Sequence, residues 1–254
     1  MTLTRRQFSA SLLAALASFA CSDDSNPIQP LPDAEITVLF AGNSLTYTNG
    51  LPALVQTIAE AAGHTFASYD RSQPNFSLED HFFTGFEGDL AAVQPDIVVM
   101  QQGPSSLPQN QTYLKEWTET LSESIESAGA RPALFMVWPA VTSLDAFDAV
   151  RQSYSDAAEA VDGIFIPAGV AWERVWAARP NTVMYSSDGF HPSAVGSVVA
   201  ALTVYRMLFD ESVADLPVEL VPTTPGLPTI DLGPDLAPVV YQAVEEAVLL
   251  FGRP

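Results

Sequence analysis

The chain has 254 residues, 48% of them hydrophobic, and carries 10 basic against 30 acidic residues for a formal net charge of −20. This charge excludes nucleic acid as a partner, because the phosphate backbone would repel so acidic a protein. A single cysteine excludes an internal disulfide framework, yet roughly 220 residues beyond a leader are enough to bury one α/β core. The acidic residues are scattered, as is typical of a solvated surface.

An export signal is predicted over residues 1–20. Arg5 and Arg6 precede an apolar stretch that is too short to span a bilayer, and the arginine pair resembles a twin-arginine signal. Cys21 follows a sequence similar to a lipoprotein cleavage site, so lipidation is favoured over cleavage that leaves a free thiol. Residues 21–33 then form a flexible tether. We expect a periplasmic or outer-surface protein whose only membrane contact is a lipid anchor at Cys21.

Beyond residue 33, short apolar runs alternate with segments of helical spacing. Strands are predicted at 36–40, 65–69, 96–100, 133–138 and 164–166. Helices are predicted at 52–62, 114–128, 145–161, 195–209 and 238–251. This order predicts a single domain over 34–254, a three-layer α/β/α sandwich around a mainly parallel sheet of about five strands.

A serine follows the first predicted strand in a turn of small residues. The run from Val38 to Ala41 leads directly into Ser44, where a hydroxyl would stand clear of the backbone. Far downstream, Asp188 and His191 stand three residues apart. A serine hydroxyl becomes nucleophilic when an imidazole takes its proton and a carboxylate orients that imidazole. These residues are expected to meet, because ligands of parallel sheets bind beyond the carboxyl ends of the strands.

The two segments Gly42-Asn43-Ser44-Leu45 and Asp188-Gly-Phe-His191 resemble the first and last blocks of the SGNH (GDSL-like) hydrolase superfamily. The resemblance implies a flavodoxin-like SGNH hydrolase fold. It also implies ester hydrolysis through an acyl-enzyme on Ser44, with His191 and Asp188 completing a triad and without a cofactor.

Stabilising the oxyanion of such a reaction requires fixed hydrogen-bond donors. The backbone N–H of Ser44 is one. The resembling families add a glycine amide and an asparagine side chain, and this chain departs from both patterns. Asn75 stands where the glycine is expected, and asparagine tolerates the left-handed backbone conformations found there. The third block contains Gln101 and Gln102, similar to branches in which glutamine replaces asparagine; Gln102 matches better, but spacing leaves both open.

Three further residues are expected to line the substrate pocket. Asn43 and Tyr47 flank the serine, and Trp138 ends a predicted strand. A metal site formed by the Asp188 loop with His64 or His81 is disfavoured, because the chain has three histidines and no paired ligand spacing. His81 is expected to be structural, and no metal is predicted.

The resemblance, together with its glutamine variant, implies an esterase that removes short acyl groups such as acetyl from a carbohydrate or another small ester. Two alternatives stay open. The altered oxyanion blocks are compatible with a surface lipoprotein that keeps the fold and binds glycan without hydrolysing it. A lipase acting on long acyl chains is the other.

Overall fold

A five-stranded parallel sheet forms the centre of the computed structural model, which describes residues 34–252. The strands lie in the order β2-β1-β3-β4-β5, and each neighbouring pair is parallel. Their bounds are β1 Ile36–Ala41, β2 Phe66–Asp70, β3 Ile97–Met100, β4 Arg131–Phe135 and β5 Ile164–Ile166. The predicted export signal, the tether and Cys21 lie outside the described residues.

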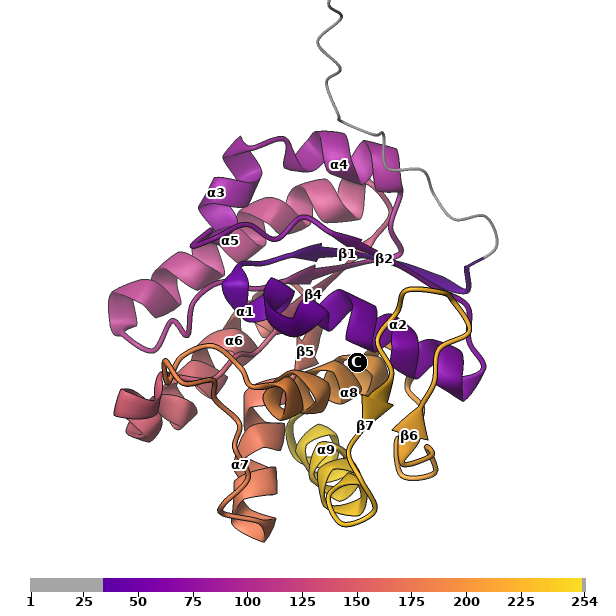
Figure 1. Cartoon of the computed structure of the whole chain (residues 1–254). Helices are drawn as coiled ribbons and strands as arrows, with labels where there is room; N and C mark the ends of the chain where they lie inside the picture. Colours follow the sequence, from indigo (N-terminus) through magenta and orange to yellow (C-terminus); the bar gives the residue numbers. More distant parts are fainter. Residues whose placement is uncertain (1–33, 253–254) are drawn as a thin grey trace, which may run out of the picture.

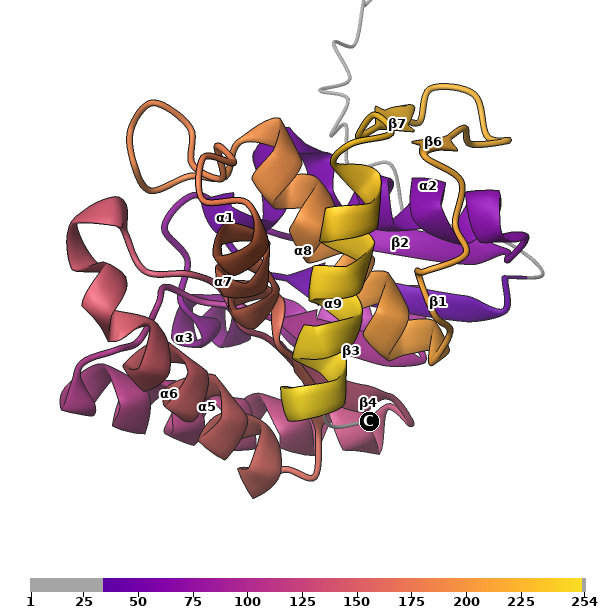
Figure 2. The ribbon, with the colours of Figure 1, turned by 90° about the horizontal axis from the view of Figure 1, so that it is seen from below.

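Helices cover both faces of this sheet (Figures 1 and 2). One side carries α2 Leu51–Ala62, α7 Ala168–Ala178, α8 Ala194–Phe209 and α9 Ala237–Phe251. The other carries α3 Leu78–Phe83, α4 Phe86–Val93, α5 Pro108–Ser127 and α6 Phe147–Ala160. The predicted three-layer α/β/α sandwich is therefore confirmed.

Local sequence explains the elements nearest the site. All four residues of β3 are buried, as expected of a strand covered on both faces. Pro52 lies in the first turn of α2, where its missing N–H costs no helical hydrogen bond. Gly63 ends α2 with a φ of 97°, a left-handed conformation in which its N–H bonds back to the carbonyl of Ala59. These signals fix α2 directly behind the turn that carries Ser44.

Several predicted boundaries differ from the structure. The fourth strand ends at Phe135 rather than Trp138, because its neighbour β5 ends at Ile166 and offers no further partner. The segment 136–138 nevertheless stays fully buried. Helix α5 begins at Pro108, earlier than predicted. The prediction relied on apolar spacing, and the first turns of this helix are polar. The short helices α3 and α4 were not predicted, and the Pro-rich stretch 217–234 contains the small antiparallel pair β6 Glu219–Leu220 and β7 Ile230–Asp231.

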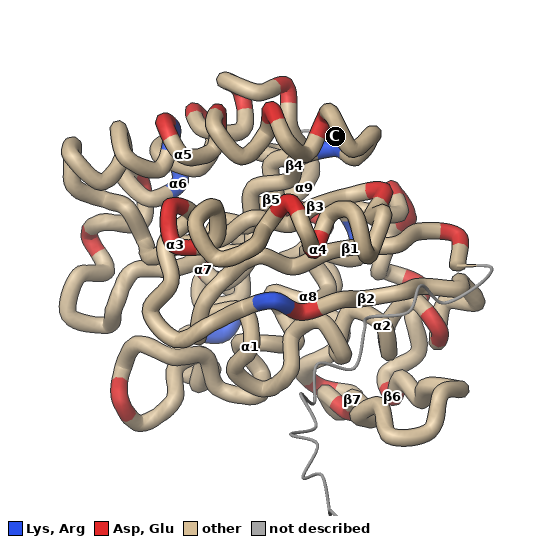
Figure 3. Tube along the Cα trace, turned by 90° about the horizontal axis from the view of Figure 1, so that it is seen from above, with Lys and Arg blue, Asp and Glu red and all other residues tan. Residues whose placement is uncertain are grey.

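Trp172 is fully buried, while Trp117 and Trp176 are half-buried and pack against the core. Acidic side chains are spread over many elements rather than gathered in one patch (Figure 3). Within residues 34–252, no helix is both long and apolar enough to span a membrane.

His64 ties together the end of the sheet that lies opposite Ser44. Its Nδ1 lies 2.7 Å from Glu35 and its Nε2 3.0 Å from Glu211, so one ring bridges the start of β1 and the segment after α8. Burial alone would lower the pKa of His64, but the hydrogen bonds to Glu211 and Glu35 outweigh it and raise the pKa above the ordinary value of 6.5. The protonated ring therefore stabilises the fold.

We expect the stability that His64 contributes to be lost as pH rises. A raised folded-state pKa stabilises the protein below the unfolded pKa, and the contribution disappears as pH rises through the folded pKa. The difference in free energy of unfolding between wild type and His64→Gln, measured by urea denaturation, should be larger at about pH 6 than at about pH 9. An equal difference at both pH values would contradict this role.

Candidate functional site

Ser44 is the first residue of α1 (Ser44–Tyr47), which starts just after the carboxyl end of β1 and continues into a 3-10 turn, Thr48–Gly50. The side chain of Asn43 caps this helix, because its Oδ1 accepts from the backbone N–H of Leu45 at 3.1 Å. Gly42 is required by close packing, since a Cβ there would lie 2.3 Å from Thr46 Oγ1. The sharp strand-to-helix turn predicted around Ser44 is present.

Gln101 holds this turn from the inside. It is fully buried, and its Oε1 accepts from the backbone N–H of Asn43 at 2.9 Å and from the Thr46 hydroxyl at 2.8 Å. Its Nε2 donates to Asn43 Oδ1 at 3.0 Å and to the carbonyl of Gln102. Both N–H groups of this amide are used within the protein, so the alternative in which Gln101 serves the oxyanion is contradicted.

Asp188 and His191 form a hydrogen-bonded pair on the loop before α8. Asp188 Oδ2 accepts from His191 Nδ1 at 2.5 Å, while Oδ1 accepts from the Ser186 hydroxyl at 2.7 Å and from the backbone N–H groups of Phe190 and His191 at 2.9 and 3.0 Å. The bond from His191, followed by the Phe190 amide and the Ser186 hydroxyl, holds the pKa of Asp188 well below its usual range. The ionised carboxylate keeps the proton of His191 on Nδ1 and leaves Nε2 as the accepting nitrogen.

Two contacts from the segment after β4 fix this loop. Trp138 Nε1 donates to the carbonyl of Phe190 at 3.1 Å. The backbone N–H of Val141, at the start of the 3-10 helix Val141–Ala146, donates to the carbonyl of Gly189 at 2.8 Å. Gly189 has a φ of 70°, and a Cβ there would lie 2.5 Å from Val141. The loop is therefore held by its backbone, which leaves the His191 side chain free for chemistry.

Asn49 connects the two halves of the site. It lies five residues beyond Ser44 with a left-handed φ of 58°, and its Nδ2 donates to the carbonyl of Pro192 at 3.1 Å and to Ser197 Oγ at 2.9 Å. Pro192 directly follows His191. The segment after the serine is thus bonded to the segment after the histidine.

A cavity of about 360 Å³ lies at this edge of the sheet. It is walled by the turn after β1, the segment before α3, the segment after β3 and the Asp188 loop. The lining residues are Asn43, Ser44, Asn75, Phe76, Ser77, Gln102, Gly103, Pro104, Ser105, Asn110, Tyr113 and Phe190. Ser44 and the chain neighbour of His191 therefore face the same cavity.

Four residues of the cavity wall, Ser44, Asn75, Gly103 and Ser105, have a backbone N–H without a protein acceptor within residues 34–252. Asn75 has a φ of 63°, which is the left-handed conformation that the sequence allowed for. It occupies the third position of a turn closed by the Phe76 N–H to the Gln73 carbonyl at 3.3 Å, with Pro74 at the second position. The N–H groups of Ser44 and Asn75 are thus not used in hydrogen bonds within the described part of the protein.

Gln102 supplies a side chain beside them. Its Oε1 accepts from the Leu78 N–H at 3.3 Å, and its Nε2 donates to Ser105 Oγ at 3.0 Å, which leaves the second N–H of the amide without a partner among the described residues. The Tyr154 hydroxyl holds the backbone of Gln102, donating to its carbonyl at 2.6 Å. Burial raises the pKa of Tyr154 far above its ordinary value, so this hydroxyl stays protonated.

Two predicted pocket residues do not line the cavity. Trp138 is fully buried and stacks on Trp172 with ring centroids 3.6 Å apart. It contacts the Asp188 loop through its bond to the Phe190 carbonyl. The prediction failed because a position at a strand end does not reveal which way the chain turns next. Tyr47 is 37% exposed and is not among the described residues of the cavity wall. Asn43 does line the cavity, but its Nδ2 is engaged by the Phe76 carbonyl at 3.0 Å.

Sequence reasoning missed eight residues of the cavity wall, among them Phe76, Tyr113 and Phe190. Phe190 stands between the two predicted catalytic residues, and that position was a usable signal. Tyr113 lies on α5, where its hydroxyl meets Ser77 at 3.4 Å and also Glu79. Residue spacing along α5 does not mark Tyr113 as a cavity residue, because its place at the cavity depends on how α5 packs against α3.

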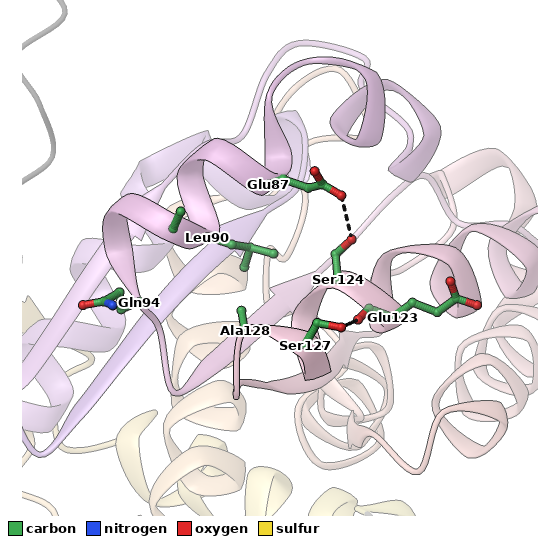
Figure 4. Close-up of a pocket in the computed structure, with 8 residues that line it drawn as sticks. Glu87, Leu90, Gln94, Glu123, Ser124, Ser127 and Ala128 are labelled. Atoms are coloured by element: carbon green, nitrogen blue, oxygen red, sulfur yellow. Dashed lines mark hydrogen bonds between the residues drawn. The ribbon is translucent and has the colours of Figure 1, made fainter.

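A hollow of about 520 Å³ lies between α4 and α5 (Figure 4). It is larger than the cavity at Ser44, yet Gln94 and Ala128 of its wall lie just before β3 and β4, at the opposite end of the sheet. None of the described residues that line it is a histidine, cysteine or lysine. The reactive side chains therefore favour the smaller cavity. Among residues 34–252, no group of three histidine, cysteine or acidic side chains is arranged to hold a metal ion.

Comparison with known proteins gives a fold. No family model matches the chain, and no curated protein matches its sequence. A DUF4886 family protein from Bacteroides uniformis is similar with a TM-score of 0.70 and 19% identity, over 84% of this chain and 95% of that one. A proposed SGNH hydrolase from Slackia heliotrinireducens is similar with a TM-score of 0.55 and 25% identity, over 69% and 100%. A family 3 carbohydrate esterase from Clostridium thermocellum has a TM-score of 0.54 at 14% identity, over 69% and 96%.

These likenesses show that the chain has the fold of SGNH (GDSL-like) hydrolases. The superfamily resemblance drawn from the serine and Asp188–His191 motifs is confirmed at the level of the fold. The branch with a glutamine in its third block stays a prediction.

Replacing Gln101 is expected to destabilise the protein. In Gln101→Leu the backbone N–H of Asn43 and the Thr46 hydroxyl lose their buried acceptor, at a cost of about 1–3 kcal/mol for each unpaired group. Urea denaturation should show this loss of unfolding free energy. Gln152→Leu, at an exposed position on α6, is the matched control and should change stability by less than about 0.5 kcal/mol. Equal stability of the two variants would refute the role assigned to Gln101.

Proposed function

We propose that the protein is an exported serine ester hydrolase in which Ser44 is the nucleophile, His191 the general base and Asp188 the orienting acid. One observation carries this proposal. A single cavity is lined by Ser44 and Asn75, whose backbone N–H groups have no acceptor among the described residues, and by Phe190 of the loop that holds the Asp188–His191 pair at 2.5 Å.

The reaction begins when Ser44 Oγ attacks the ester carbonyl and its proton passes to His191 Nε2. The proton then moves to the leaving alkoxide oxygen, so an alcohol departs and the acyl group stays on Ser44. Water, deprotonated by the same imidazole, attacks the acyl-enzyme; the acid leaves as the bond to Ser44 Oγ breaks, and the imidazolium returns its proton to that oxygen. In the structure the His191 ring bonds to Asp188 and, among the described residues, not to Ser44; such contacts commonly tighten only with substrate bound. No cofactor enters this mechanism.

The oxyanion is stabilised by neutral donors. The donors we assign are the N–H groups of Ser44 and Asn75 and the second N–H of the Gln102 amide, on three residues that line one cavity and come from different segments. A well-aimed donor of this kind contributes about 2.7–4 kcal/mol to lowering the barrier. A glutamine amide performs the same task as the family's asparagine, because any fixed amide N–H serves.

The cavity favours a small, uncharged ester. Its volume of about 360 Å³ is near the lower end of the range for ligand pockets, which suits a short acyl group such as acetyl. None of its described lining residues is lysine or arginine, and the chain as a whole is strongly acidic, so an anionic substrate would be repelled. The similarity to a carbohydrate esterase supports a sugar as the alcohol component.

The main test is Ser44→Ala. Loss of the nucleophile is expected to lower kcat/KM for p-nitrophenyl acetate by at least about 10³-fold without changing the melting temperature. A fluorophosphonate probe should label wild type and Ser127→Ala, a control on the far end of α5, but not Ser44→Ala. Retained turnover in Ser44→Ala would dispose of the assignment.

The alternatives give different results in the same assays. A glycan-binding lipoprotein lacks an activated hydroxyl, so an unlabelled wild type would favour it. A lipase would prefer long-chain p-nitrophenyl esters to acetate. Export is tested by fractionating the labelled cells: the protein should leave the cytoplasm and follow the membranes, and Cys21→Ser should become soluble if Cys21 carries the lipid.

The role of the third donor is tested with Gln102→Leu. Loss of its N–H should lower kcat by about 10²–10³-fold while KM changes little, because the bond forms to the charge of the transition state. Steady-state kinetics on p-nitrophenyl acetate measures this. A change confined to KM would instead assign Gln102 to substrate binding.

A further inference from the structure

A buried series of side chains connects the surface of α4 to the turn before Ser44. Asp89 accepts from Arg71 Nε at 2.7 Å, and Arg71 Nη1 lies 3.1 Å from His81 Nδ1. His81 Nε2 lies 2.8 Å from the carbonyl oxygen of Gly42. His81 is fully buried, although nothing in the mechanism above uses it.

The partners of His81 fix its protonation. An arginine can only donate, so Nδ1 of His81 accepts and the ring proton resides on Nε2, which donates to Gly42. Burial, reinforced by the charge of Arg71, lowers the pKa of His81 to about 4, even though the Gly42 bond and the carboxylates of Asp80 and Asp89 oppose this. The ring is therefore neutral near neutral pH and permanently presents an N–H to Gly42.

The peptide unit between Gly42 and Asn43 is held at both its carbonyl and its N–H. The carbonyl of Gly42 accepts from His81 and, at 3.1 Å, from the backbone N–H of Gln73. The N–H of Asn43, on the other side of the same peptide, donates to Gln101. The next peptide along the chain carries the N–H of Ser44, so the orientation of this donor follows from the fixed unit before it.

His81 also joins the two walls of the cavity. It belongs to α3, which starts at Leu78 just after the turn that carries Asn75. Its bond to Gly42 links that wall to the turn of Ser44, and the bond from Asn43 Nδ2 to the Phe76 carbonyl at 3.0 Å is a second link. The separation of the two unpaired N–H groups, on Ser44 and Asn75, depends on these links.

We infer that His81 is a positioning residue for ester hydrolysis: through Gly42 it sets the relative placement of the Ser44 and Asn75 oxyanion donors, and Arg71 with Asp89 keeps its ring in the donating form. The inference rests on the proposed function. Arg71 itself requires Asp89, because a buried guanidinium without a partner is strongly destabilising.

The test compares three variants of His81 with wild type on p-nitrophenyl acetate. His81→Phe keeps the ring volume but loses the donor, and misplaced donors should lower kcat by about 10- to 100-fold while KM changes less than about 3-fold. His81→Gln places its Nε2 near the position of the imidazole Nε2 and should restore kcat to within about 3-fold of wild type. His81→Asn is too short to reach Gly42 and should behave like His81→Phe.

Thermal melts are recorded for each variant, with His64→Gln as a histidine control whose kcat should stay at the wild-type value. Lower melting temperatures with unchanged kcat in His81→Phe, or equal kcat in His81→Asn and His81→Gln, would overturn the inference and leave His81 structural. If His81→Phe does not fold, the Asn and Gln pair decides. Absent turnover and absent probe labelling in wild type would instead refute the proposed function, so the two failures are distinct.

Discussion

The site depends on one constraint: buried side chains hydrogen-bond both the carbonyl and the N–H of the peptide unit between Gly42 and Asn43. Its carbonyl is bonded by His81 and its N–H by Gln101, both fully buried. A buried polar network of this kind rigidifies only when each group has a partner, and here the side chains that hold the turn are themselves held. A short turn after a strand would otherwise be free to rotate, and the position of Ser44 would rotate with it.

The opposite half of the site follows the same logic with different residues. Asp188 and His191 lie on a loop held by its backbone carbonyls, through Trp138 and through the N–H of Val141. In both halves a buried side chain fixes the backbone that carries the proposed reactive groups, and Asp188 itself also holds the loop by accepting from the N–H groups of Phe190 and His191. This is the arrangement that catalysis by preorganised groups requires, because the donors need no reorganisation as charge develops.

The electrostatics of the cavity and of the whole molecule fit the substrate class that we propose. The net charge of −20 surrounds a cavity whose described lining carries no lysine or arginine. In the proposed reaction, amide N–H groups stabilise the oxyanion, and the ionised Asp188 pairs with an imidazole that becomes cationic. Such a site suits a neutral ester and leaves the alcohol component to be chosen by the cavity wall.

By itself, the sequence determined the layered fold and the edge of the sheet at which the motifs meet, because strand and helix periods and the order of elements limit the topology of parallel sheets. It also indicated Ser44, Asp188 and His191, whose residue types and spacing carry their chemistry. Only the tertiary structure distinguished Gln101, whose amide is fully hydrogen-bonded inside the core, from Gln102, which lines the cavity. It also showed that Trp138 does not line the cavity but bonds the backbone of the Asp188 loop. It alone revealed His81 as a link to Gly42. The reason is physical: periodicity reports whether a side chain is buried, whereas its hydrogen-bond partners come from segments tens of residues away and are set only by packing.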